Sequence, residues 1–439
     1  MDPILSKALA TVRPTHREEE ALRRKADFIL ARTMEAAKGF QEVKQVLLGG
    51  SFAKGTWLRG RADLDVFLKL DSATLEQRFE EIGLRVGAEA TEGYPRGKKF
   101  AQHPYTEAEM DGVKVNIVPC YDVRPKEWKS AADRSPFHVE LVSAMPEAQK
   151  DQVRLLKMWM QGVGVYGAEI EVQGFSGYAA EVLVMTHRSF LGVLRYFADL
   201  GRVDSERLLQ LPDPVDPGRD LARAISNQKV GELVFAARKF LSSPSMKFFG
   251  TMRGRARPAM KKAAVAIVFS HRKLSEDTLW GELRRTIAHV RNHAEEEGFT
   301  VARAVAASNS SDRSALIFLP EFDRLSSLEQ KLGPTVERKA ATEAFLRANS
   351  RDAKLIWVDE EGRLRILRER KHTDLKSFLS KMVGSGVRGV GASESMARGL
   401  ARSGKVLSGS QLARAAASAP WLREGLERIA SDTIGTSSS

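Results

Sequence analysis

The sequence contains a single cysteine, Cys120, which excludes an internal disulfide framework and a metal site built from several cysteines. Histidines are also few. Of the eight, only His289 and His293 stand at the spacing of two ligands on one helix face, and no glutamate lies between them. We interpret this pair as an ordinary helix face. Any bound metal is therefore expected to have oxygen ligands.

Long hydrophobic runs are absent as well. No uninterrupted apolar stretch approaches the roughly 18 residues that a membrane-spanning helix needs. The N-terminus lacks a basic region followed by a hydrophobic signal core. We therefore expect a cytoplasmic protein with no membrane partner.

Positive charge, by contrast, is in excess. The 439 residues include 69 lysines and arginines against 56 aspartates and glutamates, which leaves a formal net charge of +13. This surplus favours a polyanionic partner such as nucleic acid, because basic side chains neutralise phosphates and release counterions. The composition is typical of a globular protein, and the length allows roughly two to four domains.

The most informative motif is a Gly-Gly-Ser turn at residues 49–51, followed by Asp-Leu-Asp at residues 63–65. Residues two apart on a strand face the same way, with Cα atoms about 6 to 7 Å apart, so Asp63 and Asp65 can converge on metal ions. Two Mg²⁺ ions about 3.5 to 4 Å apart would fit between these carboxylates and a triphosphate. The glycines let backbone N–H groups approach phosphate oxygens, and Ser51 adds a hydroxyl donor. The alternative is a hairpin turn beside two solvated aspartates.

Hydrophobic periodicity and turn signals predict an α+β multidomain fold in four segments. Residues 1–136 have the pattern of a mixed sheet with helices, and residues 137–242 are mostly helical. Residues 243–383 predict a second α/β unit. Residues 384–439 begin with a glycine-rich linker, continue with two short helices and end in a frayed serine-rich tail.

Some strands can be predicted individually. An Asp111-Gly112 turn precedes an alternating strand at 113–118. Further strands are expected near 265–269 and 315–319, and the pattern at 354–367 predicts a hairpin.

Five further segments carry a resemblance to one family. They are His103-Pro104-Tyr105, Val118-Pro119-Cys120-Tyr121, Asp133 to His138, Arg154 to Lys157 with Val165 to Glu169, and Gly174 to Tyr178. With these segments the sequence closely resembles the archaeal, class I CCA-adding tRNA nucleotidyltransferases. The resemblance continues through residues 213–219 to 332–334 and weakens after residue 384.

The resemblance implies a nucleotidyltransferase head, a helical neck that recognises nucleotide and primer, and an α/β body and a tail that bind tRNA. Similar enzymes add C, C and A to the tRNA 3′ end from CTP and ATP, use Mg²⁺ and commonly work as homodimers. The implied partners are therefore the tRNA acceptor arm, CTP, ATP and a second copy of the chain.

The resemblance also implies a set of nucleotide-binding residues. They are Gly50, Ser51, Lys54, His138, Lys157, Tyr166 and Arg219. Ser51 and Lys54 match positions that hold the triphosphate, and Arg219 matches an arginine that helps to recognise base and primer. Because the family often has arginine at the position of Lys54, this lysine would act as a point charge rather than as a fork. Judged without the resemblance, each of these side chains has the alternative of a solvated or packed residue.

The sequence departs from the family at Asn116, which stands where the third catalytic, metal-binding carboxylate is expected beside Asp63 and Asp65. Asparagine offers a neutral amide oxygen but no negative charge and no proton acceptor. The substitution alone would cost on the order of 3 to 4 kcal/mol in the transition state, or roughly two to three decades in rate. Asp111 and Asp122 lie about 16 to 20 Å away along an extended strand, so neither replaces it easily.

Three functions remain open at this point. The first is a CCA-adding nucleotidyltransferase that is attenuated at Asn116. The second is a noncatalytic homologue that binds tRNA and nucleotides, and the third is a related poly(A) or oligoadenylate polymerase that uses ATP without CTP.

Overall fold

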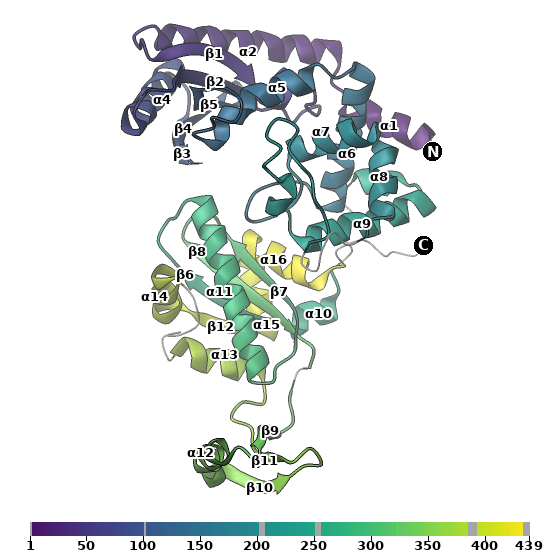
Figure 1. Cartoon of the computed structure of the whole chain (residues 1–439), viewed down its shortest axis with the longest axis vertical. Coiled ribbons are helices and arrows are strands. Elements are labelled where there is room, and N and C mark those ends of the chain that lie inside the picture. Colours follow the sequence, from purple (N-terminus) through teal and green to yellow (C-terminus); the bar gives the residue numbers. More distant parts are fainter. Residues whose placement is uncertain are drawn as a thin grey trace. The chain divides into compact units, whose positions relative to one another are not determined.

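A computed structural model describes residues 2–100, 102–201, 207–250, 256–322, 324–384 and 393–432 of the chain. The described residues divide into two compact units, one that ends at residue 250 and one that spans residues 256–432. Each unit combines helices with sheets (Figure 1), which confirms the predicted α+β multidomain class. The finer division at residues 136, 242 and 383 stays a prediction. The predicted linker after Gly384 and most of the serine-rich tail lie outside the described residues.

The first unit is built on a five-stranded sheet. Its strands stand in the order β1 (Val43–Gly49), β2 (Leu64–Asp71), β5 (Val113–Asp122), β4 (Pro104–Met110) and β3 (Arg96–Phe100). In this sheet β2 and β5 run parallel, and the other neighbouring pairs are antiparallel. The sheet is therefore mixed, as predicted for the head.

The turn at Asp111 and Gly112 sets the register of β4 against β5. Both residues have positive φ, 50° and 76°, which a tight two-residue hairpin turn requires. Met110 consequently pairs with Val113, and the further pairs follow outward along both strands. The predicted turn and the strand after it are confirmed.

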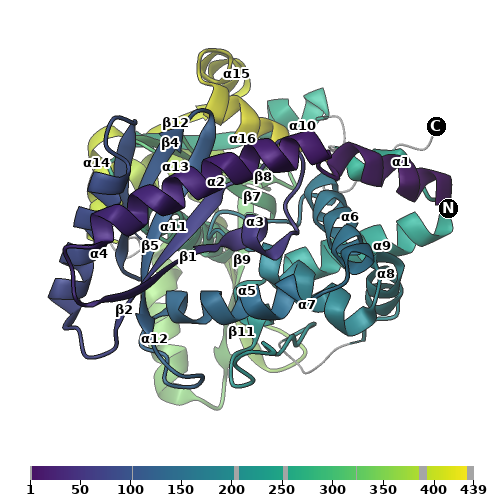
Figure 2. The same cartoon turned by 90° about the horizontal axis from the view of Figure 1, so that it is seen from above.

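Helices cover one face of this sheet. Helix α2 (His16–Ala37) begins at a capping box and lies along the sheet beside α4 (Glu76–Ala90) (Figures 1 and 2). Ile29 of α2 and Leu64 of β2 belong to the same buried core. Because successive strand residues alternate between faces, Asp65 projects from the opposite face of the sheet.

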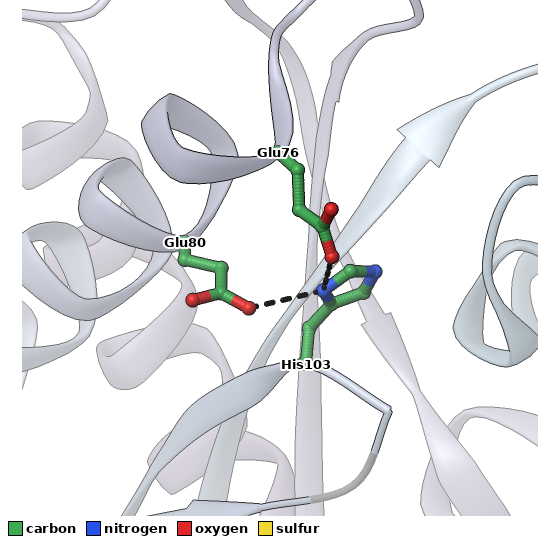
Figure 3. Close-up of side chains that lie close together, drawn as sticks. All are labelled: Glu76, Glu80 and His103. Carbon is green, nitrogen blue, oxygen red and sulfur yellow. Dashed lines mark hydrogen bonds and ion pairs between the residues drawn. The ribbon is translucent and has the colours of Figure 1, made fainter.

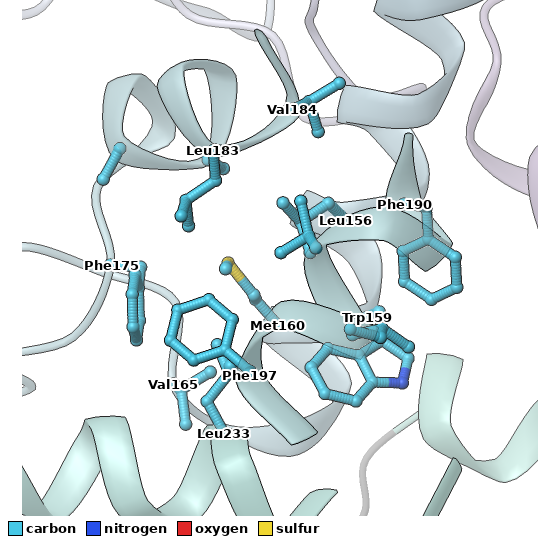
Figure 4. Close-up of a cluster of buried hydrophobic side chains, with 14 of the residues drawn as sticks. Leu156, Trp159, Met160, Val165, Phe175, Leu183, Val184, Phe190, Phe197 and Leu233 are labelled. Atoms are coloured by element: carbon cyan, nitrogen blue, oxygen red, sulfur yellow. The ribbon is translucent and has the colours of Figure 1, made fainter. Parts of the chain in front are cut away.

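The rest of the first unit is largely helical. Its α-helices are α1 (Asp2–Val12), α3 (Gly50–Lys54), α5 (Ser135–Ser143), α6 (Glu147–Val163), α7 (Gly177–His187), α8 (Phe190–Ala198) and α9 (Asn227–Ser242), and its 3₁₀ helices are η1 (Ala131–Arg134), η2 (Leu221–Ala224) and η3 (Met246–Phe249). Trp159 of α6 is fully buried in their core, near Phe190 (Figure 4). The centroids of the Phe190 and Phe240 rings lie 6.1 and 6.3 Å from that of Trp159. These edge-to-face contacts join α6 to α8 and α9.

The second unit contains two sheets. The four-stranded sheet has the order β12 (Lys405–Ser408), β6 (Val265–Ser270), β8 (Arg313–Pro320) and β7 (Val301–Ser308), and the three-stranded sheet has the order β10 (Ala353–Val358), β11 (Arg363–Glu369) and β9 (Leu328–Thr335). The helices are α10 (Pro258–Ala263), α11 (Glu276–Glu296), α12 (Lys339–Asn349), η4 (Ser350–Asp352), α13 (Leu375–Gly384), α14 (Glu394–Ser403), α15 (Gly409–Ser418) and α16 (Pro420–Ala430). The predicted strands near 265–269 and 315–319 and the predicted hairpin are confirmed.

One expectation for the C-terminal segment is wrong. Residues 393–430 form three helices and a strand rather than two short helices, because Lys405–Ser408 pairs antiparallel with β6. His289 and His293 are both exposed on α11, in agreement with an ordinary helix face. Among the described residues, no helix is both long enough and apolar enough to cross a membrane.

Candidate active site

The three predicted catalytic positions lie together at one end of the parallel strand pair. Asp63 immediately precedes β2, and Asp65 on β2 is in register with Asn116 on β5. Asn116 Nδ2 donates a hydrogen bond of 2.9 Å to Asp65 Oδ1. The other polar atom of this amide, Asn116 Oδ1, is buried without a hydrogen-bond partner. A buried carbonyl oxygen without a donor is available as a cation ligand.

The electrostatics of the two carboxylates also fit a cation. Burial raises the pKa of Asp65; the hydrogen bond from Asn116 opposes this shift, and the Asp63 carboxylate adds to it. Partial desolvation raises the pKa of Asp63. The Lys114 ammonium group lowers this pKa, and the Glu107 carboxylate raises it. Neighbouring carboxylates of this kind are stabilised in their ionised form by a positive ion between them. Carboxylate and amide oxygens are a donor set that suits Mg²⁺.

The glycine turn packs directly on this group. Gly50 has a φ of +63°, and a Cβ atom built on it would lie 1.8 Å from Asp65 Oδ2. A Cβ atom on Gly49 would lie 2.1 Å from the ring of Phe67. Both glycines are thus needed for close approach, and Gly50 also for its left-handed backbone. The adjacent Ser51, on α3, is partly exposed.

The two predicted lysines meet at a carboxylate that the motifs did not reveal. Lys54 Nζ lies 2.9 Å from Glu181 Oε2, and Lys157 Nζ lies 2.7 Å from Glu181 Oε1. The exposed fractions are 8% for Lys54, 2% for Lys157 and 1% for Glu181. Burial by itself would raise the pKa of Glu181, but the two ammonium groups and their hydrogen bonds lower it to about 2. The cluster therefore holds two positive charges against one negative charge.

Tyr166 approaches this lysine cluster from the loop before α7. A Cβ atom on Gly177 would lie 2.9 Å from the Tyr166 hydroxyl and 3.6 Å from Lys157 Nζ. The absence of a Cβ atom at Gly177 therefore lets the phenol and the ammonium group both lie close to the start of α7.

The remaining predicted residues gather around Asp213, which is fully buried. Its Oδ2 atom lies 3.1 Å from His138 Nε2 and 3.2 Å from Arg219 Nη1, and its Oδ1 atom accepts a 2.8 Å hydrogen bond from the Tyr178 hydroxyl. The rings of His138 and Tyr178 stack at a centroid distance of 3.7 Å. Lys54 Nζ lies 4.9 Å from the centroid of the Tyr178 ring, which connects this group to the lysine cluster.

The protonation states in this second group follow from burial and pairing. Burial lowers the pKa of His138 although Asp213 opposes the shift. Burial works against ionisation of Asp213, but the hydrogen bonds from His138 and Tyr178 hold its pKa below the ordinary value. Asp213 is therefore ionised, and its contacts orient the stacked rings of His138 and Tyr178 and the side chain of Arg219. We refer to Asp213 with these three partners as the Asp213 hub.

A separate group, Glu76, Glu80 and His103, ties α4 to the start of β4 (Figure 3). His103 Nδ1 lies 3.7 Å from Glu76 Oε1 and 3.2 Å from Glu80 Oε1. Among the described residues, these three side chains form a group whose potential metal-ligand atoms all lie within 4.8 Å of one another. The His103 ring also packs against Phe79 at a centroid distance of 5.0 Å, so we interpret the group as a structural tether.

Models of three protein domains match successive parts of the chain. A nucleotidyltransferase domain matches residues 30–138, the second domain of tRNA nucleotidyltransferases matches 151–250, and the C-terminal domain of CCA-adding enzymes matches 261–409. The first match contains the carboxylates, and the second contains the lysine cluster's Lys157 and Glu181.

Several CCA-adding enzymes match this chain over most of their own length. A CCA-adding enzyme from Sulfolobus acidocaldarius is 33% identical over 385 residues, which are 85% of this chain and 89% of that enzyme. A CCA-adding enzyme from Pyrobaculum neutrophilum is 31% identical over 408 residues, 88% of this chain and 94% of that enzyme. Solved structures are more distant: a crystal structure of the Cid1 poly(U) polymerase aligns with a TM-score of 0.43 and 13% identity over 56% of this chain and 97% of that chain.

Proposed function

Since this chain belongs to the family of CCA-adding tRNA nucleotidyltransferases, we propose that it adds C, C and A to the 3′ end of tRNA from CTP and ATP. The observation that carries the proposal is the meeting of Gly50, Asp65 and Asn116 on one face of the sheet. Glycine backbone, a pair of carboxylates and an unpartnered amide oxygen are what a nucleoside triphosphate and its cations require.

Asp63, Asp65 and the Oδ1 atom of Asn116 would hold Mg²⁺, as the donor set and the orphaned oxygen indicate. When bound, Mg²⁺ supplies Lewis acidity toward the attacking 3′-hydroxyl and neutralises charge on the leaving pyrophosphate. Asp63 and Asp65 bring the negative charge that selects a divalent cation. Gly50 leaves room for the Asp65 carboxylate, and the missing Cβ atom would let a phosphate approach the backbone at this turn.

The triphosphate would bind beside α3. Ser51 offers a hydroxyl donor, and the Lys54–Glu181–Lys157 cluster offers a surplus of one positive charge. Because both ammonium groups are nearly buried, they act on the triphosphate mainly through this surplus charge and by fixing α3 against α6 and α7. Tyr166, next to Lys157, would contact the sugar.

Base and primer would be recognised at the Asp213 hub. The stacked rings of His138 and Tyr178 provide an aromatic surface, and stacking on a base is tolerant of its identity. The Arg219 side chain is 43% exposed and has more donors than the one that contacts Asp213. Arg219 can therefore donate to a base edge or to the primer while Asp213 holds its orientation.

Asn116 favours a second candidate, a noncatalytic homologue that binds tRNA and nucleotides. The neutral amide weakens the metal site relative to an aspartate at the same position, so we expect the natural chain to be slower than an Asn116→Asp variant. The excess of positive charge supports tRNA binding in either case. Homodimerisation and a cytoplasmic location stay predictions; light scattering measures the former.

Incorporation of labelled CTP and ATP into tRNA that lacks its CCA end distinguishes the two candidates. We expect label to enter with the natural chain and to be lost with Asp65→Ala. Asp71→Asn is the matched control, since Asp71 lies at the far end of the same strand and pairs with Lys44 at 3.1 Å. Measurable tRNA affinity without incorporation, even after Asn116→Asp, favours the binding protein. Label from ATP alone on other RNA ends would indicate a poly(A)-type polymerase.

A further inference from the structure

A second carboxylate borders Asn116 on the side away from Asp65. The antiparallel register of β4 and β5 places Glu107 directly opposite Asn116, and the parallel register of β2 and β5 places Asp65 on its other side. Directly paired residues project from the same face of a sheet. Asp65, Asn116 and Glu107 thus form one row across three adjacent strands.

Glycines stand at both ends of this row. Gly49 is paired with Asp65, and Gly97 is paired with Glu107. A Cβ atom on Gly97 would meet nothing within 4 Å, so the space beside Glu107 is open. The Glu107 side chain is consequently not confined by the neighbour on its outer side.

Glu107 has the length to act at the position of its neighbour. Directly opposite residues of an antiparallel pair have Cβ atoms about 4.5 to 5.5 Å apart. Glutamate is one methylene longer than aspartate, so a glutamate on β4 can lean across toward the oxygen of Asn116. Asp111 and Asp122 are displaced along the strand instead and do not belong to the row.

The present contacts of Glu107 are weak enough to be exchanged. Its two carboxylate oxygens each lie 3.6 Å from an ammonium group, one of Lys99 and the other of Lys114. These lysine side chains are 43% and 51% exposed, and ion pairs with such exposed partners contribute little.

We propose that Glu107 supplies the third carboxylate of the cation site and replaces the negative charge that Asn116 lacks. This inference rests on the proposed function, because it concerns the same Mg²⁺ site. Asn116 keeps the role of a neutral oxygen ligand, and Glu107 contributes its charge from the next strand. The loss of rate caused by Asn116 is then smaller than the two to three decades expected from the substitution alone.

Binding of Mn²⁺ to the full chain, followed by the electron paramagnetic resonance signal of the free ion, tests the assignment without tRNA or turnover. We expect Glu107→Gln to weaken Mn²⁺ binding about ten- to hundred-fold, the usual effect of removing a supporting group from a metal site. Glu109→Gln is the matched control, because Glu109 is exposed on the same face of the same strand, opposite Lys114. We expect its Mn²⁺ affinity to be unchanged.

Rescue supplies the second measurement. In a Glu107→Gln background, Asn116→Asp should restore Mn²⁺ binding, and the gain should exceed that of Asn116→Asp in the natural chain. Such a rescue also shows that the Glu107→Gln chain folds. Equal Mn²⁺ affinity of the natural chain and Glu107→Gln overturns the inference, as does a natural chain that binds no more Mn²⁺ than Asp65→Asn. A chain that fails to extend tRNA, yet loses Mn²⁺ affinity with Glu107→Gln, would contradict the proposed function and leave this inference standing.

Discussion

Replacement of Gly50 by alanine should damage the site through a single methyl group. The added Cβ atom would lie 1.8 Å from Asp65 Oδ2, whereas an ordinary contact begins at 3.4 Å. The carboxylate would therefore have to retreat by about 1.6 Å, and a misplacement of about 1 Å at a reacting centre can cost a hundred-fold in rate. We expect CTP incorporation into tRNA to fall by at least that factor.

Backbone strain must be separated from this displacement. Alanine at a φ of +63° also costs about 1 to 2 kcal/mol, because the left-handed conformation crowds Cβ against the carbonyl oxygen. Gly60 is a matched control, since its φ is +69° and a Cβ atom on it would meet nothing within 4 Å. Gly60→Ala should thus carry the strain without the clash.

The assay compares the rate of CTP incorporation and the midpoint of heat unfolding for the two variants. We expect the unfolding midpoint of Gly50→Ala to equal that of Gly60→Ala or to lie somewhat below it. A large loss in the rate of CTP incorporation is expected for Gly50→Ala alone. If the two variants incorporate CTP at the same rate, the contact between the glycine turn and Asp65 has no role in catalysis.

Further predictions concern the buried charges. Glu181→Gln leaves two nearly buried ammonium groups without their carboxylate and should lower the free energy of unfolding of the first unit by about 3 to 5 kcal/mol, whereas Glu35→Gln, in a pair that is 71% exposed on both sides, should change it by less than about 1 kcal/mol in the same denaturant titration. Burial lowers the pKa of His138 below its ordinary value of 6.5, so the folded state binds fewer protons than the unfolded state; stability should fall as the pH drops from 6.5 through the folded pKa, and His138→Gln should reduce this fall in pH-dependent heat unfolding. Asp213→Asn removes the ionised acceptor of three contacts and should weaken equilibrium CTP binding about ten-fold or more; unchanged CTP affinity would exclude a role in orienting the base-recognition residues. Chelation of divalent cations should abolish incorporation, and activity that persists in excess chelator would contradict the assignment of Asp63 and Asp65.

The residues of the local motifs also lie together in the structure. The Gly-Gly-Ser turn and the spacing of Asp63 and Asp65 depend on neighbouring residues, and the structure brings them together at β1, α3 and β2. The Asp111-Gly112 turn could also be predicted from the sequence, because aspartate and glycine tolerate the positive φ that a tight hairpin needs.

The partners of these residues were harder to predict because they come from distant segments. Glu181 follows Lys54 by 127 residues, and the available signal was a lone carboxylate inside the apolar run of α7, which implies a buried cation nearby. Asp213 lies in a loop without periodicity, so its hub of contacts could not be inferred from pattern. Glu107, by contrast, could have been found by counting outward from the Asp111-Gly112 turn, which pairs it with Asn116.

The C-terminal strand shows the same limit. Lys405–Ser408 has four residues between alanine-rich helices and no alternation long enough to indicate a strand. Its structure comes from antiparallel pairing with β6, more than 130 residues earlier in the chain. Tertiary pairing of this kind overrides local propensity.

The most direct measurement is the sequence of tRNA 3′ ends after incubation of CCA-lacking tRNA with CTP, ATP and Mg²⁺. With the natural chain we predict ends that carry C, C and A in that order. With Asp65→Asn, which keeps the size of the side chain but removes its charge, we predict unextended ends at unchanged tRNA affinity. Ends completed equally by both chains would contradict the claim that the carboxylates beside the glycine turn hold the catalytic cations.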